Sequence, residues 1–479
     1  MIFILPVNTN HRFALLMLYL SLKSIANKIL LMNSRTDQFL NDPVFPLLVR
    51  MSAPNTIAFF IQDIVVLAEV WFISKLGTTS LAAVALAFPI IMLTQQMAFG
   101  ALGGAVTSSI ARSLGEGDKE RAEKLLWHSL FLAACGGLLL LFMFLIGGEF
   151  LLITLGGRGL LLEQSLAYCL IFLSGATVIW LSGVLSAALR GMGNMRFPAM
   201  LMILGSGIQI TLGGSLILGW FGVPALGLIG APIAAISSAV FIALAMLLRL
   251  MHSSSEVQLK LSLLYFEKEL FKDIFNVAVP ASLSPVFTVG TILILTGLVG
   301  QFGDSALAGY GIGSRIEFLM IPLVFGIGTA MTAMVGTNIG AKKISRAERI
   351  GWVGGSIAGF FSGVIGLILF LTSSYWIGLF ATDQATYLIT KQYIEIVGFC
   401  FGFQGLGLSL YFASQGASAM KWPIYATISR FVVAALGGWI SINYFSTGIS
   451  GVFYSAAAAM TLFGLMIAIS LKMGAWRSN

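Results

Sequence analysis

The chain has 479 residues, of which 58% are hydrophobic and 10% are charged, and its formal net charge is +8. Soluble proteins carry charges at about a quarter of their positions, so this composition excludes a soluble helical protein with an ordinary core. The basic residues are spread over separate segments rather than gathered in one stripe, which argues against a nucleic-acid partner.

Residues 1–44 are predicted to be an N-terminal extension that lies in the cytoplasm or at the membrane interface. Its apolar stretch, 13–22, has only ten residues, too few to span about 30 Å of hydrocarbon. No small-residue cleavage site follows, so the stretch does not match a secretory signal. A more ordinary polar N-terminus begins at Met32, and residues 1–31 are interpreted as a misplaced start or a surface-lying segment.

Twelve apolar stretches follow, each about 20 residues long and able to cross the hydrocarbon as a helix. They are too long and too evenly apolar to be strands. The stretches cover about 51–74, 80–111, 125–147, 164–189, 197–219, 226–249, 275–300, 306–338, 351–371, 386–414, 423–444 and 449–472. The predicted fold is therefore an all-α integral membrane protein with twelve transmembrane helices. Cys135, Cys169 and Cys400 fall inside these spans and suggest neither a disulfide nor a metal site.

The two halves of the chain repeat one another, with six predicted spans in each. The stretch GEGDKERAEKL (115–125) matches GAKKISRAERI (340–350), and RGMGNMRFP (190–198) matches QGASAMKWP (415–423), both at a shift of 225. Earlier pairs, such as Pro54 with Pro280, are 226 apart, which predicts a single-residue gap in the second helix. A consistent register across nearly the whole chain indicates an internal duplication.

The duplication predicts two lobes, 45–249 and 275–472. Because each lobe has an even number of spans, both insert the same way up, as a parallel repeat around a central cavity. A linker, 250–274, joins the lobes, and its apolar and charged residues alternate as in a helix. The linker is therefore predicted to lie along the cytoplasmic surface.

Lysine and arginine occur mainly in alternate loops, including 112–124, 340–350 and the linker, whereas 219–226 and 443–449 contain none. Positively charged loops face the cytoplasm in membrane proteins. With an even number of spans, both termini are predicted to be cytoplasmic too.

The first predicted span carries two acids, Asp63 and Glu69, where a charge is costly unless it faces a cavity, is paired or takes up a proton. The two are six residues apart, about 120° around a helix, so they could border one broad cavity but not one narrow stripe. Gln62 lies on nearly the same face as Glu69. The repeat places Val289 and Leu295 at the matching positions of the second half, so the acids belong to the first half alone. A structural hydrogen bond to a neighbouring helix stays open for both.

The second half carries its own charges in the membrane: Arg315 and Glu317 in its second helix, Glu395 in its fourth and Arg430 in its fifth. A buried arginine needs a partner, and Glu317 or Glu395 could serve. Structural pairing of Glu317 with Arg430 is favoured over a gating or substrate role.

Several stretches together resemble a known family. They are Pro54 with Glu69 fifteen residues later, LGTTSLAAVAL (76–86), LRGMGNMRFP (189–198), FGDSALAGYGIGSRIEFLMIP (302–322) and VGTNIGAKKISRAERI (335–350). Over about 45–472 the chain resembles multidrug and toxic compound extrusion (MATE) transporters, most nearly their DinF-like bacterial branch. The resemblance implies a multi-pass transporter of the bacterial plasma (inner) membrane, working as a monomer in the lipid bilayer.

The resemblance also implies an ion-coupling site. In the family, the position of Glu69 is an aspartate that binds the coupling proton or sodium ion. The fifth helix often adds an asparagine and an aspartate, which correspond here to Gln209 and Gly213. Loss of the second acid disfavours a sodium site of many ligands and favours a proton carrier. A second cation site of some members would fall at Thr288 and Gln404, so that site is predicted to be absent.

The predicted ion-coupling residues are thus Glu69, Asp63 and Gln209. Residues predicted to border the cavity or pair charges are Gln62, Arg315, Glu317, Glu395, Gln404 and Arg430. The first-half spans contain acids and almost no bases, which favours cationic cargo.

The predicted function is a secondary active antiporter, not an enzyme. It would export amphipathic, cationic xenobiotics or metabolites in exchange for a proton, rather than sodium, by alternating access. No phosphate-binding loop of the G-x-x-x-x-G-K-[ST] type occurs, and no cofactor is expected. A lipid-linked oligosaccharide flippase of the same superfamily plan, and a channel or structural membrane protein, remain as alternatives.

Overall fold

The computed structural model describes residues 35–252, 255–381 and 383–477, so the predictions for residues 1–31 lie outside the described residues. Within this part of the chain every regular element is a helix. Eleven helices are long and apolar enough to cross a membrane, or twelve if a bent pair, α7 and α8, forms one span. The prediction of an all-α membrane protein is confirmed.

The helices of the first lobe follow the predicted spans. They are α3 (Val44–Ser74), α4 (Thr78–Gln95), α5 (Gly103–Glu116), α6 (Lys119–Thr154), α7 (Gly159–Ser174), α8 (Ala176–Gly191), α9 (Arg196–Leu218) and α10 (Gly230–Met251). A short helix, α2 (Arg35–Asn41), precedes them. α7 and α8 are bent by 46° relative to one another.

The second lobe has the same order of elements. Its helices are α11 (Lys268–Gly300), α12 (Asp304–Ile316), α13 (Ile321–Gly340), α14 (Ile344–Leu371), α15 (Ser373–Trp376), α16 (Gln384–Val397), α17 (Phe401–Gly416), α18 (Lys421–Asn443) and α19 (Ile449–Lys472). The 3₁₀ turns η5 (Glu317–Met320) and η7 (Gly398–Cys400) interrupt two of the predicted spans.

One irregular turn bears on the repeat. α4 and α5 are joined by a π-helical turn, η1 (Gln96–Leu102). Such a turn accommodates one more residue than the α-helix it interrupts. It lies in the half that has the additional residue, and in the helix where the gap was predicted.

Hydrogen bonds of one lobe recur in the other at the predicted shift. Thr107 Oγ1 donates to Ala187 O and Thr332 Oγ1 to Phe412 O, both at 2.9 Å, while Ser165 Oγ donates to Ala83 O at 3.3 Å and Thr390 Oγ1 to Gly309 O at 3.1 Å. The partners lie 225 or 226 residues apart, so the two lobes are built with the same internal contacts.

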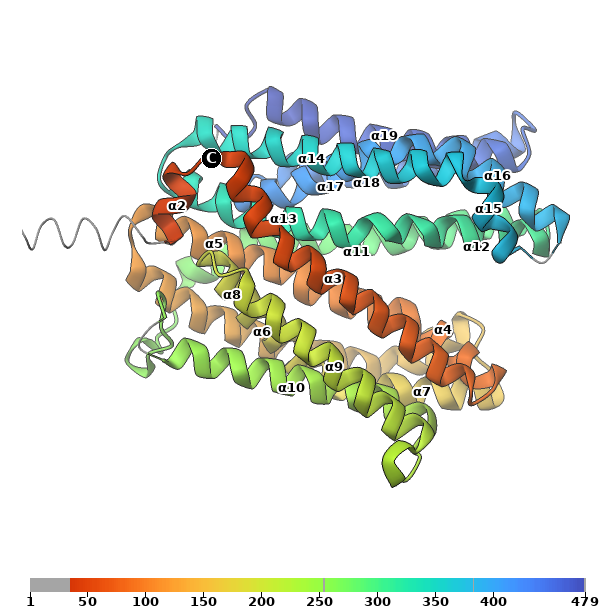
Figure 1. Cartoon of the computed structure of the whole chain (residues 1–479), viewed down its shortest axis with the longest axis horizontal. Coiled ribbons are helices and arrows are strands. Elements are labelled where there is room, and N and C mark those ends of the chain that lie inside the picture. The colour runs from red at the N-terminus through yellow and green to blue at the C-terminus, as the bar shows by residue number, and fades with distance from the viewer. Residues whose placement is uncertain (1–34, 253–254, 382, 478–479) are drawn as a thin grey trace, which may run out of the picture.

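The lobes meet at one end of the molecule, called here the basic end, where α2, the linker and the loops 117–118 and 341–343 lie (Figure 1). A single cluster of buried side chains there includes Val106 of the first lobe and Met331 of the second. Toward the opposite end the core divides into one cluster in each lobe, and the ribbons of the lobes diverge.

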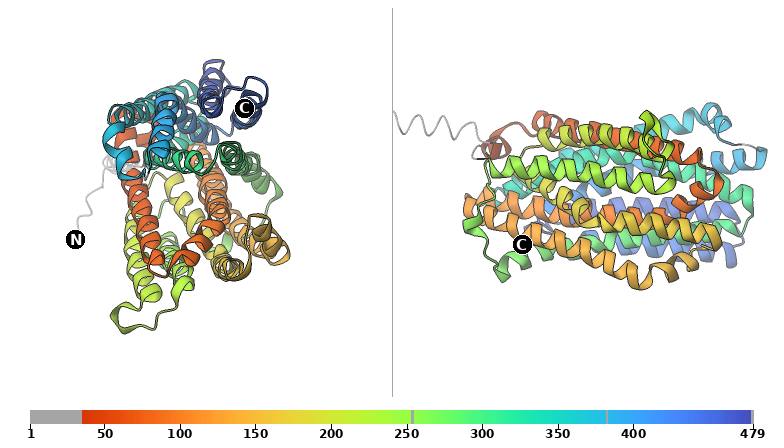
Figure 2. Two further views of the ribbon diagram at one scale, coloured as in Figure 1. Left: turned by 90° about the vertical axis from the view of Figure 1, so that its right-hand side faces the viewer. Right: turned by 90° about the horizontal axis from the view of Figure 1, so that it is seen from below.

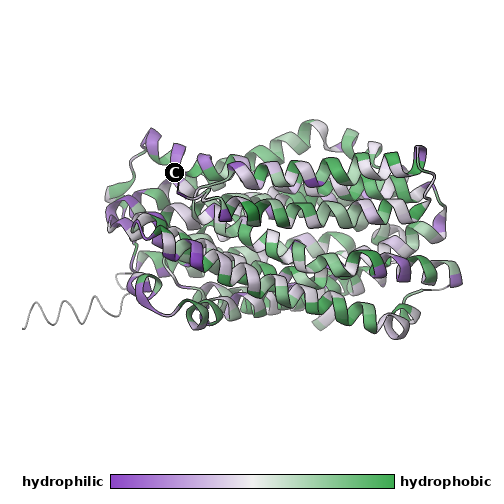
Figure 3. Cartoon of the chain, turned by 90° about the horizontal axis from the view of Figure 1, so that it is seen from above, coloured by the Kyte–Doolittle hydropathy of each residue, from purple (hydrophilic) through white to green (hydrophobic). Residues whose placement is uncertain are grey.

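The helices run roughly lengthwise between the two ends (Figure 2). Hydrophilic residues gather at those ends, with a mainly hydrophobic band between them (Figure 3). This distribution suits a chain that spans a bilayer, because charged side chains are costly in hydrocarbon.

Close contact at the basic end depends on two glycines. A Cβ atom at Gly115 of α5 would collide with the carbonyl oxygen of Thr337, and one at Gly340 of α13 with that of Arg112. The backbones of the two lobes can therefore approach closely only because both positions lack a side chain.

Two polar segments connect the lobes: α2 precedes the first lobe and contacts the second, and the linker precedes the second lobe and contacts the first. Phe39 of α2 is 1% exposed, and its carbonyl oxygen accepts from Asn338 Nδ2 and Arg346 Nε of the second lobe, at 3.0 and 3.2 Å. In the linker, Lys260 Nζ lies 2.8 Å from a carboxylate oxygen of Glu123 in the first lobe. These two crossed contacts join the lobes at the basic end.

The linker differs from its prediction as a surface helix. Apart from a single 3₁₀ turn, η4 (Leu261–Leu263), the described residues between α10 and α11 are irregular. Side-chain contacts hold this backbone: Trp127 Nε1 donates to Lys260 O at 2.9 Å, and Glu267 N donates to His128 Nε2 at 2.8 Å. α11 then begins at Lys268, earlier than the predicted span at 275, because its first two turns are polar.

Candidate functional site

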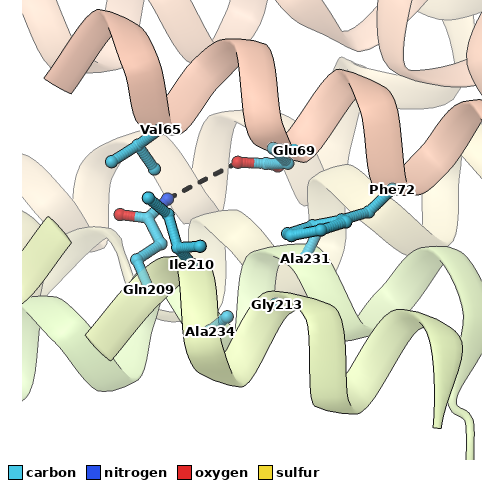
Figure 4. A pocket seen from close by; sticks show the side chains of 8 residues that line it. All are labelled: Val65, Glu69, Phe72, Gln209, Ile210, Gly213, Ala231 and Ala234. Atoms are coloured by element: carbon cyan, nitrogen blue, oxygen red, sulfur yellow. Dashed lines mark hydrogen bonds between the residues drawn. The ribbon is translucent and has the colours of Figure 1, made fainter. Parts of the chain in front are cut away.

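Glu69 lies on the face of α3 that packs against α9. Its Oε1 accepts a hydrogen bond of 2.9 Å from the hydroxyl of Tyr168 in α7. Its Oε2 accepts a longer one, 3.5 Å, from Nε2 of Gln209 in α9 (Figure 4). Three helices of the first lobe therefore converge on one carboxyl group.

A small pocket opens beside this carboxyl group, and apart from Glu69 and Gln209 its walls are apolar. The pocket is lined by Val65, Glu69, Phe72, Gln209, Ile210, Gly213, Ala231 and Ala234. Gly213 occupies the position at which the family often has a second acid, and it lies beside the Phe72 ring. Glu69 is thus the only acid among the lining residues.

Gln62 extends the polar contact between α3 and α9. Its Oε1 accepts a hydrogen bond of 3.4 Å from Ser206 Oγ. Gln62 and Glu69 are seven residues apart, or about 10 Å along a helix. The two contacts therefore form a polar stripe along one helix–helix boundary.

Asp63 lies on a different face of α3, as its spacing from Glu69 implies. It shares that face with Phe59, whose ring packs edge-on against Phe325 of α13 with centroids 5.9 Å apart. Asp63 is exposed one turn beyond this contact, toward the end where the lobes diverge. Its carboxylate has no hydrogen-bond or ion-pair partner among the described residues. It is not among the residues that line the pocket.

In the second lobe, Glu317 lies in the turn η5 and accepts a hydrogen bond from the hydroxyl of Tyr393 in α16. The guanidinium of Arg430 lies over the ring of Phe463, 5.6 Å from its centroid. Glu317 and Arg430 interact electrostatically, but among the described residues no ion pair within 4.0 Å includes Arg430.

Glu395 is not a partner of Arg430, which corrects one of the two predicted pairings. It is exposed, and its Oε1 lies 3.9 Å from Nζ of Lys391, one turn earlier on α16. The local spacing of four residues along an exposed helix face favours this pair.

The other predicted residues lie apart from the pocket. Arg315 is exposed. Gln404 in α17 is 6% exposed, and its Oε1 has no hydrogen-bond partner among the described residues. Thr288 is partly buried in α11.

Two tyrosines at these sites were not predicted from the sequence. Tyr168 and Tyr393 are separated by 225 residues, the shift of the repeat, and each donates to a glutamate. Because the shift was known, a search for polar residues kept in both halves would have found them.

Comparison with known proteins agrees with this architecture. The MatE family model matches residues 54–213 and 280–440, one match in each lobe and together more than half of the chain. The probable multidrug resistance protein NorM of Thermotoga maritima is 26% identical over 90% of this chain and 93% of its own length.

Two further relatives are comparably similar. A protein of Shewanella oneidensis named FAD transporter is 26% identical over 89% of this chain and 94% of its own. A solved structure described as the outward-facing conformation of a multidrug resistance MATE family transporter of the MOP superfamily is 25% identical. Its TM-score is 0.84, over 92% of this chain and 98% of its own.

Proposed function

Because the chain belongs to the MatE family of multidrug and toxic compound extrusion transporters, we propose that it exports amphipathic cations in exchange for protons that bind at Glu69. It is a multi-pass membrane transporter of small molecules rather than an enzyme. The assignment to a DinF-like branch stays a prediction.

The environment of Glu69 is the observation that carries this proposal. A carboxylate away from water is costly unless it is compensated by a charge or by several hydrogen bonds. Here it has two neutral donors, Tyr168 and Gln209, and no cationic partner in the part of the chain that the structure describes. Uptake of a proton removes the charge and keeps a hydrogen-bonded carboxyl group, so the site suits both protonation states.

Sodium is disfavoured by the same pocket. Hard cations are held by several oxygen ligands, whereas this pocket offers one carboxylate, and the Gln209 amide points its nitrogen at it. Among the described residues no group of three or more His, Cys, Asp or Glu side chains could hold a metal ion.

The basic end faces the cytoplasm in this proposal, because lysine and arginine accumulate on the cytoplasmic side of membrane proteins. The protein then lies in the bacterial plasma membrane, and both described ends of the chain are in the cytoplasm. Since the lobes meet at the basic end and diverge at the other, the conformation corresponds to an outward-facing state.

In this proposal, the charge on the Glu69 carboxyl group couples the exchange of protons for cationic cargo. In the outward-facing state, a proton from the proton-rich side neutralises Glu69, and the cavity releases a cationic cargo. In the inward-facing state the proton leaves, and the restored carboxylate favours a new cation. Proton and cargo are exchanged as long as they do not bind together. Asp63, exposed on another face of α3, adds negative charge on the cargo's path.

The decisive experiment is export by purified protein in liposomes, with a fluorescent cationic dye under an imposed proton gradient. Glu69→Gln should fold but reduce export to the level of liposomes without protein, because it fixes the neutral state. Glu69→Asp should retain part of the activity with a shifted pH dependence, and Asp63→Asn should do less damage than Glu69→Gln. Glu163→Gln is the matched control, since Glu163 is exposed on the same helix as Tyr168.

Two outcomes would overturn the proposal: normal export by Glu69→Gln, or wild-type export that follows a sodium gradient and ignores pH. The substrate panel should include FAD and a lipid-linked sugar diphosphate. If the protein transports FAD and no cation, its activity is that named for the Shewanella relative. If it transports the lipid-linked sugar diphosphate and no cation, it is a flippase.

A further inference from the structure

A tyrosine–glutamate pair occurs once in each lobe. Tyr168 donates to Glu69 in the first lobe, and Tyr393 donates to Glu317 in the second. The two tyrosines occupy equivalent positions of the repeat, 225 residues apart. Both are almost fully buried, at 3% and 2% exposure.

The two glutamates are not equivalent in the repeat. Glu69 comes from α3, whereas its counterpart in α11 is Leu295, a buried apolar residue. Glu317 comes instead from η5, between α12 and α13. The second lobe has therefore acquired its own carboxyl group against the same tyrosine, and the site at Glu69 does not account for it.

The pair at Glu317 lies in an aromatic enclosure. The Tyr393 ring packs edge-on against Tyr310 of α12 and Phe453 of α19, with centroids 5.5 and 5.1 Å apart. A Cβ atom at Gly313 would collide with the Tyr393 ring, so this glycine lets α12 and α16 approach. Among the described residues, the titratable or charged groups that act on Glu317 are the hydroxyls of Tyr310 and Tyr393 and the guanidinium of Arg430 in α18.

Arg430 gives Glu317 a second possible partner. An ion pair within a membrane protein stabilises only when its members are in contact, because both charges lose their hydration. Here the guanidinium rests on the Phe463 ring, and the carboxyl group is held by Tyr393 instead. A tyrosine hydroxyl can donate a hydrogen bond to a neutral or to a charged carboxyl group, whereas a guanidinium favours only the charged form.

The location of Glu317 ties this choice to the motion of the lobe. It is the first residue of a 3₁₀ turn that joins α12 to α13, and a break in a helix is a place where backbone angles can change. α13 packs against α3 and α5 of the first lobe. A change of backbone angles at Glu317 would therefore move α13, which forms part of the contact between the lobes.

We propose that Glu317 is a second proton-binding site, which is neutral when held by Tyr393 and moves toward Arg430 when it loses its proton. The ligand is a proton and not a metal ion, because the site has one carboxyl group and an arginine close by. Its coupling to transport rests on the proposed function, but proton binding itself can be measured without transport.

The test is pH-difference infrared spectroscopy of the purified full-length protein, which records the C=O band of each buried carboxyl group that titrates. In the Glu69→Gln background a band that belongs to Glu317 should remain, and it should vanish in Glu69→Gln/Glu317→Gln. Tyr393→Phe should move the remaining band, because the carboxyl group loses its hydrogen bond. Glu395→Gln, an exposed acid on the same helix as Tyr393, should change nothing.

A spectrum that is unchanged by Glu317→Gln and by Tyr393→Phe would overturn the inference. If Glu317→Gln fails to fold, Tyr393→Phe still decides, since it keeps the carboxyl group of Glu317 and a merely structural role would not move a carboxyl band. Normal export by Glu69→Gln together with a band from Glu317 would refute the proposed function and leave this site standing.

Discussion

Asp273→Asn is expected to open the basic end of the protein. Asp273 lies in the first turns of α11, and its carboxylate contacts two arginines of the first lobe: Arg112, and Arg121 with Nη2 3.0 Å away. This group joins the second lobe to the first only while the basic end is closed. Removing its charge therefore destabilises the closed state alone.

The magnitude follows from burial. Loss of one partner of a fully buried ion pair costs about 3–5 kcal/mol, while an exposed pair contributes up to about 1 kcal/mol. The side chains of Asp273 and Arg112 are 15% and 10% exposed, and that of Arg121 is 33% exposed. An intermediate cost of about 2 kcal/mol shifts the ratio of the two states roughly 30-fold toward the open basic end.

Distances between spin labels measure this shift directly. Labels at Lys119 and Lys421, which are exposed in different lobes, can be introduced after replacing the three native cysteines. The longer-distance population should grow in Asp273→Asn and not in Glu348→Gln, because the Glu348–Arg477 ion pair (2.7 Å) joins α14 to the segment after α19 and does not connect the two lobes. Coincident distributions for Asp273→Asn and the parent would refute the reasoning.

Three further changes have expected outcomes. Tyr168→Phe removes the shorter hydrogen bond to Glu69, worth about 1 kcal/mol, and should reduce export less than Glu69→Gln while altering its pH dependence. Arg430→Ala should lower the amount of folded protein, measured by fluorescence size exclusion, and Glu317→Gln in the same chain should restore part of it; an unchanged folded amount with abolished transport would exclude structural pairing and assign Arg430 a role in transport. At Asp383, the N-cap of α16, backbone N–H groups of the first turn lower the pKa of the carboxyl group. The stabilisation it provides is present above the unfolded-state pKa and is lost as pH falls through the lowered folded-state pKa, so Asp383→Asn should reduce the unfolding temperature at neutral pH and not at strongly acidic pH.

Hydropathy predicted the spans well because membrane insertion depends on length and apolarity. The span predicted at 197–219 is α9, Arg196–Leu218, almost residue for residue. Errors gather where a helix leaves the hydrocarbon. α11 begins at Lys268 rather than at 275, since its first turns (KELFKDI) are polar and continue the helix outside the apolar band.

Contacts between helices were harder to predict, because hydropathy does not say which faces meet. The pairing of Arg430 with Glu395 failed for this reason: Lys391 is one turn away on the same helix, while Arg430 is on another. The tyrosine at Glu69 was missed because a single tyrosine in an apolar span resembles any other amphipathic core residue.

Comparing the two halves of the chain separates scaffold from function. Thr107 and Thr332 make the same hydrogen bond in each lobe, so this contact belongs to the scaffold that the two lobes share. Glu69 has no counterpart at Leu295, and Glu317 has none in the first half, where its position is occupied by Ile91. A charge in a membrane span is costly, and the fold is evidently built without one at either mirrored position. Each acid therefore belongs to its own lobe and not to the scaffold that the lobes share, and Glu69→Gln and Glu317→Gln test what each acid contributes to the proposed exchange.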